Sequence, residues 1–244
     1  VAERRATGAH QEVNEDPGGF SEALPRYYRQ NFHFQTGGWL SEESARLYDF
    51  QVDVLFSGAT AAMRRRALVP LAEILRKKDQ RCVSYVDLAC GTGGLLKLAL
   101  DAFPRLRGIG LDLSEPYLNV ARERLPSRRA GYITAMAEQL PFADSSLDVV
   151  SCVFLFHELP PKVRRQVIIE AARVLKPGGR LVVSSPNFYR VLGFRDYHPR
   201  MRGIGTKWEN WRRIRAKLHQ MKTSPDEVRF DRMEPIIKEP FTPD

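Results

Sequence analysis

Residues 86–94, VDLACGTGG, combine one acid near the end of an apolar run with three glycines in four positions. A turn from a strand into a helix needs one glycine at most, so the additional ones suggest a loop that a ligand touches. Gly91 and Gly93 can adopt positive φ and let a ligand approach the main chain closely. Gly94 leaves room where the next helix starts. The N–H groups of the loop and the helix N-terminus favour a negative ligand group such as a carboxylate.

The same segment departs from two common nucleotide-binding patterns. A dinucleotide fingerprint requires G-x-G-x-x-G, but Leu96 stands at the third glycine position. A phosphate-binding P-loop requires Lys followed by Ser or Thr, and this loop has neither. Asp87, just ahead of the loop, repels a pyrophosphate and instead suits a ligand with a cationic amine. The competing interpretation is that Asp87 only caps the following helix.

A second acid follows at the spacing expected for ribose recognition. Asp112 ends the segment GIGLD, nineteen residues past Gly93. An acid at this place can accept hydrogen bonds from both hydroxyls of an unphosphorylated ribose. The alternative is that Asp112 is a solvated strand end. A carboxylate, an amine and a ribose together describe S-adenosylmethionine.

Four motifs in order carry a resemblance to a known family. They are VDLACGTGG, GIGLDLS, AEQLPFADSSLDVV and EAARVLKPGGRLVVS, spread over about residues 82–186. In this order and spacing they resemble the class I S-adenosylmethionine-dependent methyltransferases of the small-molecule type. The resemblance implies an α/β fold, a Rossmann-like doubly wound and mostly parallel sheet, with S-adenosyl-L-methionine as cofactor.

The resemblance also implies residue roles. Asp87 would hold the methionine amine, Asp112 the ribose hydroxyls, and Phe154 would close the methionine side. The family usually has an acid one position before its alanine, whereas this chain has Met136, so adenine would be read by main-chain and apolar contacts. No metal site is expected. The full cofactor site expected on this basis is Asp87, Ala89, Gly91, Thr92, Gly93, Asp112, Leu113, Met136, Ala137, Glu138 and Phe154.

His157 is the candidate catalytic residue. It lies in FLFHELP, directly after the fourth predicted strand, where an acceptor should sit. Histidine transfers protons near neutral pH and suits a general base for a hydroxyl or an acidic carbon. The alternative is a structural histidine that packs the loop, and the neighbouring Glu158 is interpreted as an acid at a helix start.

Strand and helix patterns alternate through the central part of the chain. Short β-branched, apolar runs separated by amphipathic segments predict parallel strands with helices on both faces. Ser41 suits the N-cap of an earlier helix, and Pro70 kinks or restarts the one after it. The sequence predicts strands within 82–89, 106–113, 130–137, 146–156 and 180–186, and helices over 41–56, 60–78, 94–104, 114–125 and 160–177.

Four regions are expected along the chain. Residues 1–20 are interpreted as a disordered lead-in, 21–80 as a helical cap or lid, and 81–186 as the cofactor-binding core. The cap region is rich in aromatic residues, which could form an apolar lid hinged at residues 37–38 or simply pack on the sheet. These aromatic residues are Tyr27, Tyr28, Phe32, Phe34 and Trp39.

Residues 187–244 form the fourth region, a basic and partly helical segment. Residues 187–222 hold ten Lys or Arg against two acids, or +8 of the formal net charge of +9. A helix within them could touch RNA or an anionic membrane, or bury its tryptophan side on the protein. The family resemblance implies a sixth and an antiparallel seventh strand, for which EVRF at 227–230 is the only weak candidate. The C-terminal strands are therefore expected to be divergent or missing.

Composition limits the protein class. Hydrophobic residues make up 43% and charged residues 27%, as in soluble globular proteins, and no apolar run reaches membrane-helix length. Cys82, Cys90 and Cys152 are too few for a disulfide framework and indicate a reducing compartment. We therefore expect the cytoplasm, or an organelle stroma or matrix if a targeting segment was removed.

The leading hypothesis is methyl transfer to oxygen or carbon of a small or lipid-like organic acceptor. One alternative is an RNA or protein methyltransferase that docks through the basic C-terminal segment. Another is a non-catalytic S-adenosylmethionine-binding protein. The sequence leaves the identity of the acceptor and the oligomeric state open.

Overall fold

The computed structural model describes residues 24–25, 27–29, 38–184 and 229–231. Their centre is a six-stranded sheet in the order β3-β2-β1-β4-β5-β6, in which every neighbouring pair is parallel. This architecture confirms the predicted α/β, doubly wound fold. The strands are β1 (Tyr85–Leu88), β2 (Gly108–Asp112), β3 (Ala130–Thr134), β4 (Leu147–Val153), β5 (Leu175–Ser184) and β6 (Arg229–Asp231).

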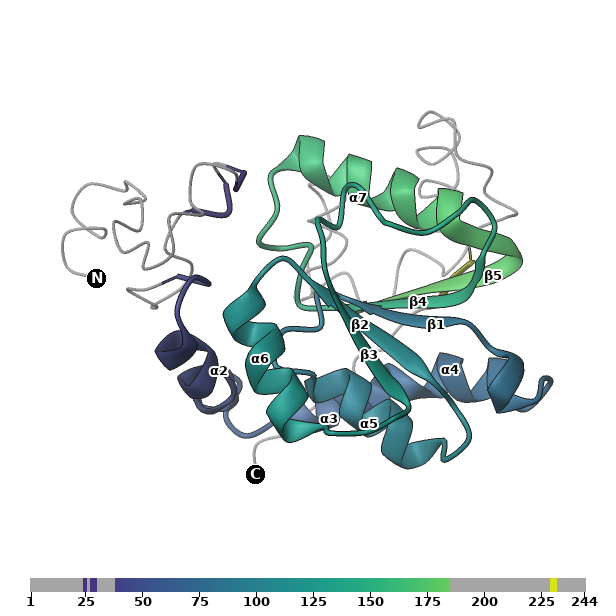
Figure 1. The fold of residues 1–244 in the computed structure, drawn as a ribbon, viewed down its shortest axis with the longest axis horizontal. Helices are drawn as coiled ribbons and strands as arrows, with labels where there is room; N and C mark the ends of the chain where they lie inside the picture. Colours follow the sequence, from purple (N-terminus) through teal and green to yellow (C-terminus); the bar gives the residue numbers. More distant parts are fainter. Residues whose placement is uncertain (1–23, 26, 30–37, 185–228, 232–244) are drawn as a thin grey trace, which may run out of the picture.

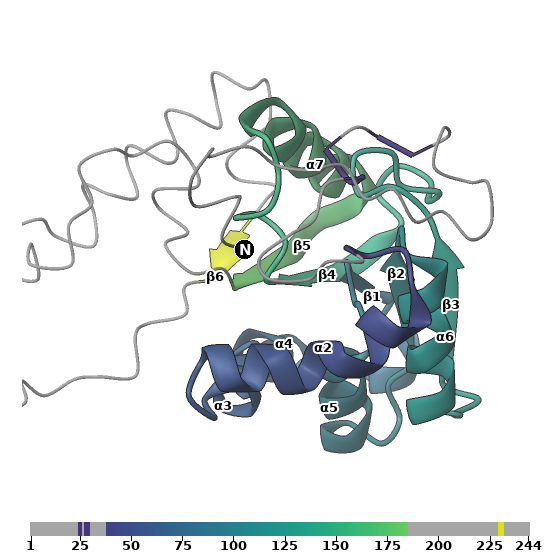
Figure 2. The same ribbon diagram turned by 90° about the vertical axis from the view of Figure 1, so that its left-hand side faces the viewer.

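Helices lie on both faces of this sheet (Figure 1). Helix α7 covers one face, and α4 and α5 lie on the other; Figure 2 shows the same layers from the side. Helix α2 packs on α6 at the edge where β2 and β3 lie. The helices are α2 (Glu42–Leu55), α3 (Thr60–Arg66), α4 (Leu68–Leu75), α5 (Gly94–Ala102), α6 (Glu115–Arg124) and α7 (Pro161–Val174).

The central strands are apolar on both sides because both of their faces are covered. Successive side chains of β1 alternate: Val86 packs into the cluster under α7, while Tyr85 packs into the cluster under α4 and α5. Strand β4 does the same with Val150 and Val149. This double burial keeps the carboxyl ends of β1, β2 and β4 in fixed register at one edge, where the site lies.

Two element boundaries differ from the sequence prediction. The helix expected over 60–78 is two helices, α3 and α4, that meet at Ala67. Pro70 lies in the first turn of α4 and has no N–H to donate to the carbonyl of Arg66, so a continuous helix would lose that hydrogen bond. The helix expected to reach residue 177 ends at Val174, because β5 already begins at Leu175, which pairs with Leu147.

The sheet continues beyond β5 with one more strand, at the segment that the sequence offered only as a weak strand candidate. Strand β6 pairs with β5 in parallel, with Arg180 opposite Arg229 and Val182 opposite Asp231. It overlaps the EVRF segment, so a sixth strand is present although its sequence signal was faint. The predicted lead-in at 1–20, Phe32 and Phe34 of the aromatic segment, and the basic helix within 187–228 lie outside the described residues.

Within the described ranges, no helix is long and apolar enough to cross a membrane.

Candidate active site

Asp87 is held by the strand next to it. The parallel register places Asp87 of β1 directly beside Ser151 of β4. The Ser151 hydroxyl donates to Asp87 Oδ1 over 2.7 Å, and it lies 2.8 Å from the hydroxyl of Tyr85. All three side chains are buried. The sequence predicted Asp87 but missed Ser151, because their contact depends on strand pairing across 64 positions.

The second oxygen of Asp87 differs from the first in its surroundings. Oδ2 is buried and has no hydrogen-bond partner among the residues that the structure describes. Burial raises the pKa of Asp87 to about 7, although the Ser151 hydroxyl and the positive charge of Arg64 act in the opposite direction. A buried carboxylate without a compensating charge is costly, so a cation that reached Oδ2 would stabilise the ionised form.

Asp112 organises the glycine loop from the end of β2. Its Oδ2 accepts a hydrogen bond from the N–H of Gly91 over 2.8 Å, and its Oδ1 accepts one from the N–H of Ser114 over 2.9 Å. Burial raises the pKa of Asp112, while these main-chain N–H groups lower it. Each carboxylate oxygen has a second lone pair, so Asp112 can still accept hydrogen bonds from two ligand hydroxyls.

The glycines of the loop serve different purposes. Gly91 has φ 54°, and an added Cβ would only reach ordinary van der Waals contact with Tyr117 at 3.9 Å, so its backbone conformation rather than crowding favours glycine. Gly93 is the N-cap of α5 with φ 78°, a conformation that side chains rarely adopt. Gly94 leaves room for the guanidinium of Arg64, which an added Cβ would meet at 2.7 Å. Gly94 is therefore explained by packing rather than by a ligand.

An acid from α2 ties the N-terminal region to this loop. Asp49 Oδ2 accepts from the Thr92 hydroxyl over 2.7 Å, and Oδ1 pairs with Arg64 of α3 over 2.9 Å. Oδ2 also pairs with Arg124 of α6. These positive charges and the Thr92 hydroxyl hold the pKa of Asp49 below its ordinary value, although burial opposes them. The sequence analysis did not single out Asp49, Arg64 or Arg124.

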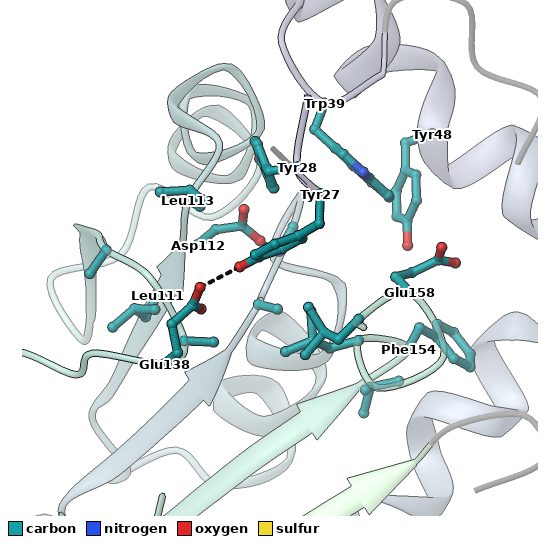
Figure 3. Close-up of a pocket in the computed structure, with 17 residues that line it drawn as sticks. Tyr27, Tyr28, Trp39, Tyr48, Leu111, Asp112, Leu113, Glu138, Phe154 and Glu158 are labelled. Atoms are coloured by element: carbon teal, nitrogen blue, oxygen red, sulfur yellow. Dashed lines mark hydrogen bonds between the residues drawn. The ribbon is translucent and has the colours of Figure 1, made fainter. Parts of the chain in front are cut away.

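A pocket opens above the loop at the carboxyl ends of the strands (Figure 3). In this view Leu113, Asp112 and Glu138 stand on one side, and Trp39, Tyr48 and Phe154 on the other. Apolar residues of β2, β4 and the loops after β3 and β4 complete the wall. These are Leu111, Ala135, Ala137, Val153, Leu155 and Leu159.

Two tyrosines from the N-terminal region also line the pocket. Tyr27 lies between the two sides in Figure 3, and its hydroxyl donates to Glu138 Oε1 over 2.6 Å. Glu138 Oε2 is buried and has no hydrogen-bond partner within the described residues. Burial, followed by the negative charge of Asp112, raises the pKa of Tyr28. The sequence analysis left open whether these tyrosines form a lid over an acceptor or pack on the sheet; the Tyr27 hydroxyl contacts Glu138 in the loop after β3.

Phe154 and Glu158 form the wall at the end of β4. Phe154 has φ 65°, a strained value for a side chain with a Cβ, and its ring stacks on Phe56 at a centroid distance of 5.3 Å. Glu158 lines the pocket and its Oε1 lies 2.9 Å from His157 Nε2. His157 itself is not among the lining residues, so Glu158 is the nearer of the two to the pocket.

The predicted cofactor residues divide into two groups. Seven of them line the pocket, and four do not: Asp87, Thr92, Gly93 and Met136. Asp87 and Thr92 are held instead by hydrogen bonds to Ser151 and Asp49, which also lie outside the lining. The lining group comprises Ala89, Gly91, Asp112, Leu113, Ala137, Glu138 and Phe154.

The arrangement can hold a ligand with several polar groups. Asp112 offers carboxylate oxygens that a diol can reach, and the wall between Leu113 and Glu138 offers apolar surface beside an acceptor, whereas Asp87 is not part of the lining. No cluster of three or more His, Cys, Asp or Glu able to hold a metal ion occurs in the part of the chain that the structure describes.

Comparisons with known proteins place this site in a family context. Residues 86–179 match the family model described as a methyltransferase domain. The chain is 34% identical over 157 residues to a demethylmenaquinone methyltransferase of Thermotoga maritima, covering 63% of this chain and 64% of the relative. It is 34% identical over 144 residues to the ubiquinone/menaquinone biosynthesis C-methyltransferase UbiE of Campylobacter jejuni, covering 57% and 58%. The chain thus spans less than two thirds of the length of these relatives.

Among solved structures, the PH0226 protein of Pyrococcus horikoshii is 32% identical with a TM-score of 0.43. The match covers 52% of this chain and 55% of that protein.

Proposed function

We propose that this chain, whose residues 86–179 match a methyltransferase domain, is a class I S-adenosylmethionine-dependent methyltransferase that transfers a methyl group to a small or lipid-like organic acceptor. The single observation that supports this most directly is Asp112, which anchors the glycine loop at the carboxyl end of β2 and faces the pocket with spare acceptor capacity. An open parallel sheet binds its ligands at this edge.

The residues present fit the cofactor of the family. Asp87 Oδ2 is a buried oxygen without a partner among the described residues, and it matches the cationic amine of the methionine part. Asp112 matches the ribose diol, and Leu113 with Ala137 offers apolar contact for adenine. When bound, S-adenosylmethionine supplies an activated methyl group on its sulfonium sulfur, so the protein's main task is to position the acceptor and to exclude water.

We propose that His157 and Glu158 handle the acceptor proton. The two side chains lie 2.9 Å apart, and Glu158 faces the pocket. Glu158 would accept the proton of an acceptor hydroxyl or acidic carbon, or would orient His157 to do so. Phe154, fixed by its stack on Phe56, would shield the reacting atoms from water.

The walls favour an acceptor with a flat, apolar ring. Trp39, Tyr48 and Phe154 give this side of the pocket aromatic surfaces, which pack well on other rings. The relatives are described by their names as methyltransferases of menaquinone and ubiquinone biosynthesis. We therefore propose a quinone-like or phenolic acceptor, in a cytoplasmic or organelle-matrix setting. Residues 21–80 would act as the cap that encloses the acceptor beside the core at 81–186.

Calorimetric titration of S-adenosylmethionine into the purified chain tests this proposal. Asp112→Ala should weaken binding by about 1–3 kcal/mol, because the hydrogen bonds to the ribose are lost. The matched control is Asp101→Ala, which removes an exposed acid paired only with Lys97 four residues before it on α5. Unchanged affinity in the Asp112 variant, or no binding by the unaltered chain, would overturn the proposal.

Incubation of the protein and labelled S-adenosylmethionine with a panel of quinols and phenols identifies the acceptor. A product heavier by one CH₂ in mass spectra is the expected result. Binding without transfer to any acceptor would instead indicate a non-catalytic protein.

A further inference from the structure

The exposed side of α2 carries large apolar side chains that the proposed reaction does not use. Leu47, Phe50 and Val54 follow one another at spacings of three and four residues, so they form an apolar row on one side of the helix. Their exposed fractions are 46%, 72% and 64%. Single exposed apolar residues are common, but a contiguous row of them marks a surface that binds something.

The described part of the chain leaves the apolar row uncovered. Helix α2 packs on α6 and contacts α3 with its other side, where Ser44 and Ala45 are buried. It lies at the left of Figure 1 and faces the viewer in Figure 2. An occupant of the row must therefore come from the chain outside the described residues, from a second copy or from another partner.

The chain itself leads to the apolar row. Ser184 is the last residue described before the stretch 185–228, and its carbonyl accepts a hydrogen bond from the N–H of Phe154 over 2.7 Å. The Phe154 ring stacks on Phe56, which is the C-cap of α2 and follows Val54 by two positions. The stretch that follows Ser184 thus starts two contacts away from the C-terminal end of the row.

Residues 207–222, within this stretch, have the matching sequence pattern. KWENWRRIRAKLHQMK carries apolar side chains at spacings of three and four, from Trp208 and Trp211 to Met221, which is typical of one side of a helix. Residues 185–206 span about 70 Å when fully extended, whereas α2 with its 14 residues is about 21 Å long. The segment can therefore reach any point on the row.

The charges of α2 and of residues 207–222 are complementary. Helix α2 holds four acids against one arginine, and Glu43, four positions before Leu47 on the same side of the helix, forms no ion pair with the described residues. Residues 207–222 hold six Lys or Arg against one acid. The acidic charge of α2 favours this basic segment, and it disfavours both α2 of a second copy and an anionic membrane.

We propose that residues 207–222 dock on the apolar row of α2, with their tryptophan-bearing side against Leu47, Phe50 and Val54. The basic charge of the C-terminal region then holds that region on α2 and does not serve to bind a nucleic acid or an anionic lipid surface. The inference is independent of the methyl transfer proposed above.

Photo-crosslinking of the full chain tests the docking directly. Replacement of Phe50 by p-benzoylphenylalanine keeps an aromatic ring on the apolar row, and mass spectrometry after irradiation identifies the linked peptides. We expect the major product to join α2 to residues 207–222 within one chain. Replacement of Ile169 by the same group is the matched control, since this α7 side chain is 38% exposed and should not link to that segment.

Tryptophan fluorescence gives a second measurement. The chain has three tryptophans, and two of them, Trp208 and Trp211, lie in the docking segment. Phe50→Ser removes much of the apolar contact, so the emission should shift to longer wavelength as these two side chains meet water. Ile169→Ser is the control and should leave the emission unchanged.

Several results would overturn the inference. A product that joins two chains would make the apolar row a dimer interface. A product with lipid alone, in the presence of phosphatidylglycerol vesicles, would make it a membrane contact. The absence of any link to residues 207–222, or an unchanged emission in Phe50→Ser, would equally exclude the proposed docking.

Discussion

At the scale of single residues, the site depends on carboxyl groups whose surroundings were only partly visible in the sequence. Asp87 and Asp112 were predicted because each follows an apolar run, Asp87 four residues before Gly91 and Asp112 nineteen residues after Gly93. The contacts of Ser151 with Asp87, Asp49 with Thr92 and Tyr27 with Glu138 were not predicted, because they join positions 43 to 111 residues apart. The local pattern therefore pointed to candidate site residues but not to the side chains that hold them.

The raised pKa of Asp87 gives cofactor binding a pH dependence. Burial raises this pKa to about 7, so the carboxyl is increasingly protonated as pH falls below 7 and then no longer attracts a cationic amine. We expect the affinity for S-adenosylmethionine, measured by calorimetry, to fall about fivefold from pH 7 to pH 6. The range stops below the ordinary pKa of an α-amine, about 7.7–8.0, where the ligand itself would lose charge.

Asp87→Asn is the control for this dependence. It cannot ionise, so its affinity should be lower at pH 7 and nearly flat over the same range. A flat profile in the unaltered chain would show that Asp87 does not face the amine. The stability of the fold changes with pH in the opposite direction. Between about pH 4 and 7, the Asp87 carboxyl is protonated in the folded state but ionised in the unfolded chain. The free energy of unfolding that this group contributes therefore falls as pH rises through that range.

At the scale of elements, helix α2 is coupled to the glycine loop. Asp49 joins α2 to Thr92 of the loop, to α3 through Arg64 and to α6 through Arg124. The sequence predicted the start of α2 from its Ser41 cap, and the structure confirms the cap, since Ser41 Oγ accepts from the N–H of Ser44. It could not show that a charged residue in the middle of this helix points to the loop.

Removal of the Asp49 charge should loosen the loop. Asp49→Asn loses a mostly buried ion pair with Arg64 and a more exposed one with Arg124, so we expect a loss of about 1–3 kcal/mol in unfolding free energy, most of it from the Arg64 pair. Affinity for S-adenosylmethionine should drop severalfold, because the hydrogen bond from Thr92 loses its charged acceptor. Denaturant unfolding and calorimetry measure these effects.

Asp53→Asn on the exposed side of the same helix is the matched control. It should change neither quantity by more than about 0.5 kcal/mol. Equal effects of the two substitutions would mean that Asp49 acts only through the general charge of α2.

At the scale of the whole molecule, two apolar clusters enclose one sheet. The cluster under α7 and the cluster under α4 and α5 share the strands β1, β4 and β5, so neither can form without them. The alternation of strands and helices was enough to predict this arrangement. The end of the sheet was harder to predict, because β6 is three residues long and its pairing partner, β5, lies 45 residues earlier in the chain.

The shared sheet predicts one cooperative unfolding transition. Leu100→Ala on α5 empties a fully buried position and should destabilise the fold by about 2–5 kcal/mol. Circular dichroism in a denaturant series would show a single transition at a lower midpoint. Val69→Ala on α4 is the control, since that side chain is 46% exposed and should shift the midpoint little. Two separate transitions would contradict a common core.

The Tyr27–Glu138 hydrogen bond also has a consequence for the order of folding. Closing a loop of 111 residues carries a large entropic cost, which falls sharply once the intervening sheet has brought the two ends together. The binding surface is therefore among the last parts to mature, after the backbone is already ordered. During synthesis, Tyr27 can form its hydrogen bond to Glu138 only after 111 further residues have been added to the chain.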